Sequence, residues 1–176
     1  MEVVYEDNHI IIVNKAPGEI VQGDKTGDKP LVDIVKEWIK EKYAKPGNVF
    51  CGVVHRLDRP VAGLVVFAKT SKALTRLNEM FRNGQVEKTY WAITRNRPPH
   101  DSDRLVHYIT TVERNNKSYA SPKPKAGAKE SALSYRLIGS SKSFNLLEVK
   151  LETGRKHQIR VQLSTIGCPV KGDLKY

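Results

Sequence analysis

The sequence is poor in features that are typical of secreted, membrane-spanning and zinc-binding proteins. It contains two cysteines, Cys51 and Cys168, which lie far apart and have no histidines at paired spacing. Neither a disulfide framework nor a zinc site is therefore predicted. No apolar run approaches the ~20 residues that a membrane-spanning helix needs, and the first residues do not form a basic and then apolar leader. These absences predict a cytoplasmic protein with no membrane partner.

Patterns for nucleotide cofactors and metals are missing as well. The sequence has neither a Gly-x-Gly-x-x-Gly nor a phosphate-loop motif, and its five histidines lack metal-ligand spacing. We therefore expect no bound cofactor and no metal.

Acidic residues are outnumbered, with 19 Asp and Glu against 30 Lys and Arg, which gives a formal net charge of +11. Such a field attracts phosphate polymers or acidic surfaces.

Apolar residues recur at two different periods along the chain, which indicates a mixture of strands and helices. Strands are predicted at residues 3–5, 10–13, 51–57, 63–69, 86–94, 131–138 and 143–152. Helices are predicted from Leu31 up to Pro46, from an N-cap at Ser71 up to Gly84, and over 157–166. Most successive strands are joined closely enough to pair antiparallel. The sequence thus predicts an α+β fold in which helices flank a mainly antiparallel sheet.

A chain of 176 residues suits one domain, and we expect residues 1–176 to form it. Residues 95–130 change character, because Arg and Lys are mixed there with Pro, Asn, Ser and Gly. Residues 121–129 are too rich in proline and glycine to pack as a central element. We interpret 95–130 as a basic insert, part hairpin and part loop, whose cations contact phosphates.

The most informative segment is His-Arg-Leu-Asp-Arg at residues 55–59, which is followed by an apolar strand pattern. It places Asp58 between Arg56 and Arg59. A nearby guanidinium favours the charged form of a carboxyl group, so we expect Asp58 to be ionised at neutral pH. An ionised aspartate can act as a nucleophile. The alternative is a surface aspartate in a tight turn.

Four segments in order resemble the RluA-type pseudouridine synthases. They are residues 55–70 around Asp58, residues 87–92 (Glu-Lys-Thr-Tyr-Trp-Ala), residues 151–161, which contain His-Gln-Ile-Arg, and residues 167–173. The resemblance implies the pseudouridine-synthase catalytic fold, a long bent sheet with a central cleft between two halves. It also implies an isomerase that breaks the glycosidic C–N bond of a uridine, turns the uracil and rejoins it through carbon-5. No electrons are transferred, so no redox cofactor or metal is required.

The same resemblance implies three catalytic residues. Asp58 matches the essential carboxylate, which either attacks the ribose or abstracts a proton from it. Tyr90 would stack on the uracil and relay the carbon-5 proton, although a sheet tyrosine packed in the core is the alternative. Arg160 matches the arginine that pairs with the aspartate, and Arg155 is its competitor. Trp91 lies on the opposite face of the strand from Tyr90 and is expected in the core.

The implied substrate is structured RNA, either ribosomal or transfer RNA. Arg56 matches the motif arginine that helps to open the RNA or fills the gap left by the extruded base. The remaining predicted RNA contacts are His55, Arg59, Arg155, Lys69 and Lys72. We expect a monomer without an obligate protein partner.

The sequence departs from the family pattern in two places. Residues 60–62 read Pro-Val-Ala where many members carry an acidic residue and then Thr-Ser, and the chain stops at Tyr176 where relatives continue with further strands. We also expect no small RNA-binding S4 domain.

Two other functions stay open, a catalytically silent RNA-binding relative and a nucleoside hydrolase. The hydrolase would need a second carboxylate, for which Glu148 and Glu152 are the candidates.

Overall fold

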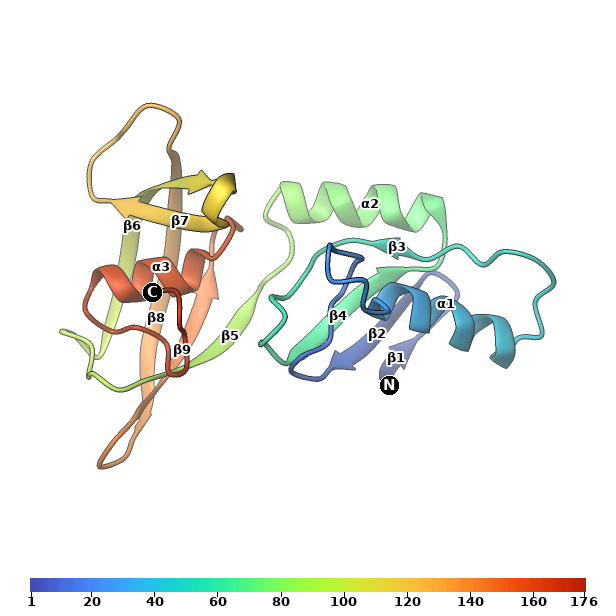
Figure 1. Cartoon of the computed structure of the whole chain (residues 1–176), viewed down its shortest axis with the longest axis horizontal. Coiled ribbons are helices and arrows are strands. Elements are labelled where there is room, and N and C mark those ends of the chain that lie inside the picture. The colour runs from blue at the N-terminus through green and yellow to red at the C-terminus, as the bar shows by residue number, and fades with distance from the viewer. The chain divides into compact units, whose positions relative to one another are not determined.

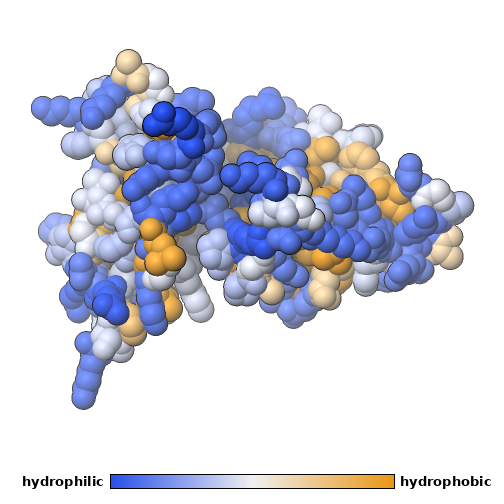
Figure 2. All heavy atoms as spheres, viewed as in Figure 1, coloured by the Kyte–Doolittle hydropathy of each residue, from blue (hydrophilic) through white to orange (hydrophobic).

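The computed structural model describes residues 1–176 and divides them into two compact units, Met1–Gln85 and Val86–Tyr176 (Figure 1). Each unit has its own antiparallel sheet and its own apolar core. No helix of either unit combines the length and the apolar character that crossing a bilayer would demand. Hydrophilic side chains cover much of the face seen in Figure 2.

The first unit consists of a four-stranded sheet in the order β1-β2-β4-β3 and two helices. Its strands are β1 (Glu2–Glu6), β2 (Ile10–Lys15), β3 (Gly52–Val53) and β4 (Gly63–Ala68), and its helices are α1 (Leu31–Lys42) and α2 (Ser71–Arg82). Alternate residues of β2 face the core, where Ile11 and Val13 are fully buried. They pack with Phe67 of β4 and with the apolar face of α1.

Helix α2 begins one residue before the predicted position. Its N-cap is Thr70, whose hydroxyl oxygen accepts a hydrogen bond from the backbone N–H of Ala73 at 3.1 Å. An N-cap side chain satisfies one of the backbone donors that a first helical turn leaves unpaired. The predicted cap, Ser71, is the first helical residue. Gly84 follows the helix with a φ of +68°, a conformation that favours glycine.

The second unit consists of a five-stranded sheet in the order β5-β9-β8-β6-β7 and one α-helix. Its elements are β5 (Thr89–Thr94), β6 (Ser102–Val112), the 3-10 turn η1 (Glu113–Asn115), β7 (Lys117–Ser121), β8 (Lys129–Ser140), β9 (Asn145–Leu151) and α3 (Gln158–Thr165). Leu133, Leu147 and Val149 of the sheet form its core with Leu163 of α3. Helix α3 therefore covers one face of this sheet.

The predicted α+β class is confirmed, and every strand pair is antiparallel. The structure has two separate sheets where the sequence suggested one bent sheet, and the cleft between two halves stays a prediction. Within the basic segment 95–130, β6 and β7 pair as the expected hairpin. Residues 122–128 have no regular structure, as their proline and glycine content predicts.

A charged cluster anchors the end of β1. The carboxylate of Glu6 is paired with Lys42 at 2.7 Å and with Lys69 at 2.6 Å, and it accepts a hydrogen bond from the Tyr43 hydroxyl at 2.8 Å. Burial alone would raise the pKa of Glu6, but these hydrogen bonds lower it to about 2. The cluster ties β1 to α1 and to the residue that follows β4.

We expect Glu6 to make folding stability depend on pH. Its lowered pKa means that the stabilisation is fully present above the ordinary carboxyl pKa and is lost as the pH falls from about 4.5 toward about 2. Glu6→Gln should lower the free energy of unfolding by roughly 2 kcal/mol at pH 7 and by much less near pH 2. Denaturant unfolding at both pH values measures this difference. Glu37→Gln, which removes an exposed carboxylate paired with Lys29, is the control; equal losses at both pH values would contradict the assignment.

Candidate active site

Asp58 lies in an irregular segment between β3 and β4, and neighbouring backbone groups hold its turn in place. The carbonyl of Asp58 accepts a hydrogen bond from the N–H of Val61 at 3.0 Å. The carbonyl of Arg59 accepts one from the N–H of Gly18 at 2.8 Å and another from Nζ of Lys15 at 3.1 Å. The turn that carries the predicted catalytic carboxylate is thus attached to the segment that follows β2.

His55 takes the place of a strand carbonyl in the sheet. Its Nε2 accepts a hydrogen bond from the N–H of Val66 in β4 at 3.1 Å. Its ring stacks on the ring of Phe81 in α2, with 5.1 Å between the two ring centres. This explains why the strand predicted over 51–57 contains only Gly52–Val53, because beyond Val53 a side chain replaces the backbone partner of β4. The RNA contact predicted for His55 stays a prediction, and the structure gives its ring a structural role.

Replacing His55 with Phe tests this role. The substitution keeps a flat ring against Phe81 and removes the acceptor for the Val66 N–H. Because Val66 is partly buried, we expect a loss of roughly 1–2 kcal/mol in the free energy of unfolding and faster hydrogen exchange at the Val66 amide. NMR-detected exchange measures both. Phe81→Leu, which weakens the ring contact but keeps the acceptor, should leave the Val66 amide protected, and protection of Val66 in His55→Phe would contradict the assignment.

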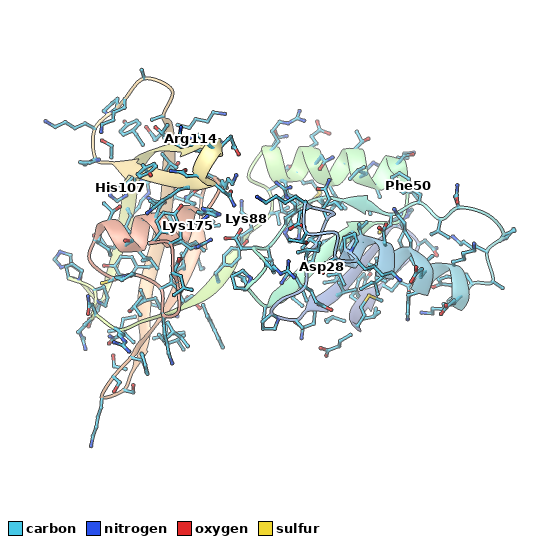
Figure 3. The ribbon with its side chains drawn as sticks, viewed as in Figure 1. Asp28, Phe50, Lys88, His107, Arg114 and Lys175 are labelled. Atoms are coloured by element: carbon cyan, nitrogen blue, oxygen red, sulfur yellow. The ribbon has the colours of Figure 1, made fainter.

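The two arginines beside Asp58 differ in their surroundings. Arg56 is exposed, as an RNA contact requires. Arg59 is also exposed, but its guanidinium is paired with Asp28, in the loop between β2 and α1 (Figure 3). This pair ties the Asp58 turn to a second loop of the same unit.

The two predicted lysine contacts also differ. Lys72 is exposed in the first turn of α2. The side chain of Lys69 is only 9% exposed, because it is paired with Glu6 and donates to the carbonyl of Asp7 at 2.6 Å. RNA binding by Lys69 stays a prediction, and its observed partners belong to the fold of the first unit.

Tyr90 lies in β5 on the face that packs against the core of the second unit, where it is half-buried beside the buried Ala92. Trp91 points to the other face and is 73% exposed, so its predicted place in the core is wrong. The register explains the difference, because Tyr90 pairs with the buried Val149 whereas Trp91 pairs with Glu148. The alternation of buried Val149 and charged Glu148 along β9 was the sequence signal for this orientation.

Arg160 lies in α3 and forms a bidentate ion pair with Asp173. Its Nε donates to Oδ2 of Asp173 at 2.5 Å and its Nη2 donates to Oδ1 at 2.9 Å. Burial alone would raise the pKa of Asp173, whose side chain is 4% exposed, but the hydrogen bonds from Arg160 and from the backbone lower it. Sequence reasoning assigned no role to Asp173, although it ends the fourth motif segment.

Tyr176 completes the surroundings of Arg160. The guanidinium carbon lies 5.1 Å from the centre of the Tyr176 ring. The Tyr176 hydroxyl accepts a hydrogen bond from the N–H of Ser118 at 2.7 Å and forms a second hydrogen bond with Nδ1 of His157 at 2.8 Å. Lys175, labelled in Figure 3, donates to the carbonyl of Asn116 at 2.7 Å. Asp173 and its neighbours therefore hold Arg160 against the body of the second unit.

Arg155, the competitor of Arg160, is exposed in the segment between β9 and α3. Its backbone N–H donates to Oε1 of Gln158 at 2.9 Å. The side chain of Gln158 is buried and also donates to the carbonyl of Ala132 at 3.0 Å. The backbone of Arg155 is thus fixed by a buried amide, while its side chain faces solvent as a phosphate contact would.

Glu148 and Glu152, the candidate second carboxylates of a hydrolase, are both in surface ion pairs. Glu148 is paired with Arg136 at 3.2 Å and Glu152 with Arg104 at 2.7 Å. The pKa of Glu152 is lowered by the hydrogen bond from Arg104. A general acid for glycosidic cleavage needs the opposite, a raised pKa, so Glu152 is poorly suited to that role.

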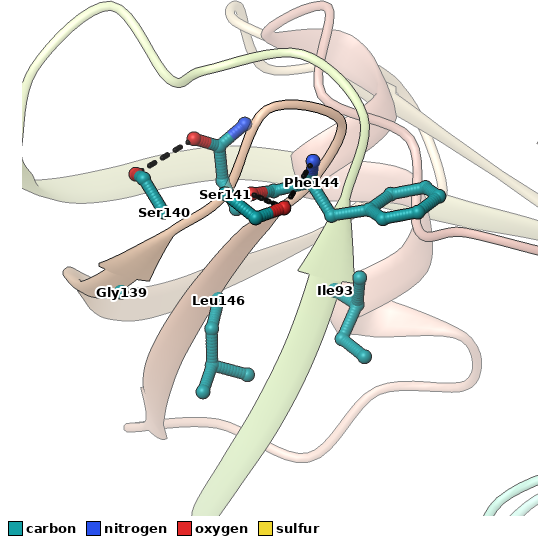
Figure 4. A pocket seen from close by; sticks show the side chains of 7 residues that line it. Ile93, Gly139, Ser140, Ser141, Phe144 and Leu146 are labelled. Atoms are coloured by element: carbon teal, nitrogen blue, oxygen red, sulfur yellow. Dashed lines mark hydrogen bonds between the residues drawn. The ribbon is translucent and has the colours of Figure 1, made fainter.

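A shallow pocket of about 230 Å³ lies beside the turn between β8 and β9 (Figure 4). Ile93, Phe144 and Leu146 line it, and the hydroxyl of Ser140 donates to Oδ1 of Asn145 at 3.0 Å at its edge. None of the predicted site residues lines this pocket. No group of three or more His, Cys, Asp or Glu side chains is placed to hold a metal ion.

The sequence model of the RNA pseudouridylate synthase family matches residues 9–165. The chain therefore belongs to this family. The match includes Asp58, Tyr90 and Arg160. The predicted resemblance is confirmed, because the curated relatives include RluA-type enzymes that act on the large ribosomal subunit.

Individual relatives match the whole chain. Ribosomal large subunit pseudouridine synthase D from Zymomonas mobilis is 34% identical over all of this chain and 56% of its own length. tRNA pseudouridine synthase C from Pectobacterium carotovorum is 29% identical over 98% of this chain and 47% of its own length. The solved structure of human RNA Pseudouridylate Synthase Domain Containing 4 has a TM-score of 0.84 and 28% identity over 99% of this chain and 68% of that one. This chain thus spans about half the length of these curated relatives.

Proposed function

We propose that this protein isomerises specific uridines to pseudouridine in structured RNA. The observation that carries the proposal is the family match over residues 9–165, which includes Asp58 in its anchored turn. Ribosomal RNA and tRNA are the proposed substrate classes, because one relative is named as an enzyme of the large ribosomal subunit and another as an enzyme of tRNA. The net charge of +11 supports a polyanionic partner.

In this proposal Asp58 supplies the carboxylate that attacks the ribose or abstracts a proton from it while the uracil departs. The target base has to leave its stack first, at a cost of a few kcal/mol, and the exposed Arg56 fills the gap. The glycosidic C–N bond breaks, the uracil turns, and a C–C bond forms at carbon-5. The proton lost from carbon-5 balances the proton gained at nitrogen, so the reaction is an isomerisation without a redox partner.

Tyr90 and Arg160 complete the proposed site. The half-buried ring of Tyr90 is anchored on the core of its unit, which gives a rigid surface for stacking on the uracil. Arg160 is the proposed counterpart of the arginine that pairs with the catalytic aspartate in the family that the sequence resembles, and Asp173 fixes its guanidinium.

The test is to incubate the protein with unmodified transcripts of ribosomal RNA and of tRNA, and then to separate the nucleosides of the digested RNA. Pseudouridine in the digest supports the proposal and identifies the substrate class. Unchanged RNA that nevertheless binds the protein would overturn it in favour of a silent RNA-binding relative. Free uracil would overturn it in favour of a nucleoside hydrolase.

A further inference from the structure

The second sheet has one face that no helix of its unit covers. Helix α3 packs on the opposite face, toward which Tyr90 and Ala92 point. Because side chains alternate across a strand, Trp91 and Ile93 of β5 share the open face. Trp91 is 73% exposed, more than any other large hydrophobic side chain in a strand, and Ile93 is 45% exposed. Exposed apolar patches on a soluble protein commonly mark an interaction site.

The pocket shown in Figure 4 lies on the same face as Trp91. Ile93 pairs across the strands with Leu146 of β9, and both line this pocket of about 230 Å³ together with Phe144. In Figure 4 the side chains of Ile93 and Leu146 point to the same side of the sheet. Trp91 lies two residues before Ile93, which is roughly 7 Å along a strand. An exposed indole and an apolar hollow are therefore neighbours on one surface.

This combination is complementary to itself. In a dimer with two-fold symmetry, residue i of one copy contacts residue j of the other, and j contacts i in return. With the two-fold axis between Trp91 and the pocket, the indole of each copy enters the pocket of the other, so both contacts form at once. Tryptophan is among the residues that contribute most to protein interfaces when it fills a pocket of the partner. A second copy therefore supplies both the indole and the hollow that this face requires.

The charges on the open face distinguish a second copy from RNA. The chain has a net charge of +11, but two arginines of this face are already paired, Arg136 with Glu148 at 3.2 Å and Arg104 with Glu152 at 2.7 Å. Along β6, β8 and β9 its basic residues are Arg104, Arg136 and Lys150, and its acidic residues are Glu130, Glu148 and Glu152. RNA binding draws on cations that are available to phosphates. Like charges across a protein interface are costly, so a face whose charges cancel suits a second copy.

We propose that the open face of the second sheet is a docking surface for a second copy of this chain, with Trp91 of each copy in the pocket of the other. The sequence predicted a monomer, and it also placed Trp91 in the core, where the indole would be unavailable for such a contact. A face of five strands, with β9 seven residues long, projects an area of roughly 500–600 Å². Each partner in a standard interface contributes about 800 Å², so we expect a weak and reversible dimer. This proposal does not depend on the proposed function.

Sedimentation equilibrium of the full chain tests the association at protein concentrations from roughly 5 to 500 µM, in about 0.3 M salt to screen the repulsion between two positive copies. We expect a monomer–dimer equilibrium with a dissociation constant of roughly 10–100 µM. Trp91→Thr, which removes the indole and keeps a residue suited to strands, should weaken the dimer at least about tenfold. Val4→Thr is the matched control, because Val4 is a 52% exposed strand residue of the first unit, and its dimer should match that of the wild type.

Two further observations locate the interface. The methyl NMR signals of Ile93 and Leu146 should shift as the concentration of the wild-type chain rises, and they should stay constant in Trp91→Thr. Ile93→Thr, which alters the pocket and keeps the indole, should weaken the dimer as well, so the proposal does not rely on one variant. A dimer that forms without any shift at Ile93 would place the interface elsewhere and overturn the proposal.

A mass that stays monomeric up to the highest concentration would also overturn the proposal, as would a Trp91→Thr dimer that is as tight as that of the wild type. Single-stranded RNA added to dilute, monomeric protein checks the other occupant, because exposed aromatic side chains can stack on bases. RNA binding that is lost in Trp91→Thr, in a protein that forms no dimer, would assign the face to RNA instead.

Discussion

Asp58→Asn is expected to abolish the conversion of uridine to pseudouridine while the affinity for RNA stays nearly the same. Asparagine preserves the shape of the side chain but lacks the anionic oxygen that either proposed route requires. The backbone bonds of the turn, from Val61 and Gly18 to main-chain carbonyls, do not involve the carboxylate and should persist. We expect single-turnover rates at saturating RNA to fall by at least roughly 10²–10⁴-fold.

The control for this substitution is Asp33→Asn, which also removes one carboxylate from the first unit. Asp33 is paired with Lys36 in helix α1, and a surface pair of this kind contributes little to stability. It should therefore leave turnover close to that of the wild-type protein. Isomerisation that survives in Asp58→Asn would refute the role of this residue, whatever the control does.

The second large effect is expected for Asp173→Asn, through its pair with Arg160. The Asp173 side chain is 4% exposed and that of Arg160 is 20% exposed, so removing the negative charge leaves a cation in a largely desolvated place. Breaking a pair of this type costs about 3 kcal/mol of the free energy of unfolding. Under the proposed function, a guanidinium that has lost its orienting partner should also lower kcat by about 10²-fold.

The pH dependence separates the electrostatic effect of Asp173 from a packing defect. Because the folded-state pKa of Asp173 is lowered, its contribution is present above the ordinary carboxyl range and disappears as the pH falls through the lowered value. The difference in unfolding free energy between wild type and Asp173→Asn should therefore shrink in acid. Asp101→Asn, which removes the partner of the exposed Arg97, is the control. A difference that is constant with pH would mean that the charge of Asp173 contributes nothing.

Much of the fold could be predicted from local patterns. The alternation in β2 and β4, the apolar stripe of α1 and the glycine after α3 each act within a few residues, so a single sequence contains the information. The boundary of β3 could not be predicted in this way. It depends on a histidine side chain that meets a backbone N–H eleven positions along the chain, and strand patterns do not encode such a substitution.

The site was predictable as a set of motif residues and less so as a set of contacts. The motifs identify Asp58, Tyr90 and Arg160, but they do not reveal that Arg160 is held by Asp173 thirteen residues later. They also give no reason to expect a buried ammonium at Lys15, because lysine at the end of a strand usually faces water. The error at Trp91 had a different cause, since its hydrophobicity was weighed without the polar face of its neighbour β9.

The different surroundings of the two tryptophans make them separate optical reporters. Trp38 is half-buried against the core of the first unit, with the Lys42 ammonium 4.4 Å from its ring centre, whereas Trp91 in the second unit is 73% exposed. An indole that is already hydrated emits at nearly the same wavelength before and after denaturation. Changes in intrinsic fluorescence will consequently follow the melting of residues 1–85, and the melting of residues 86–176 needs a different probe, such as circular dichroism.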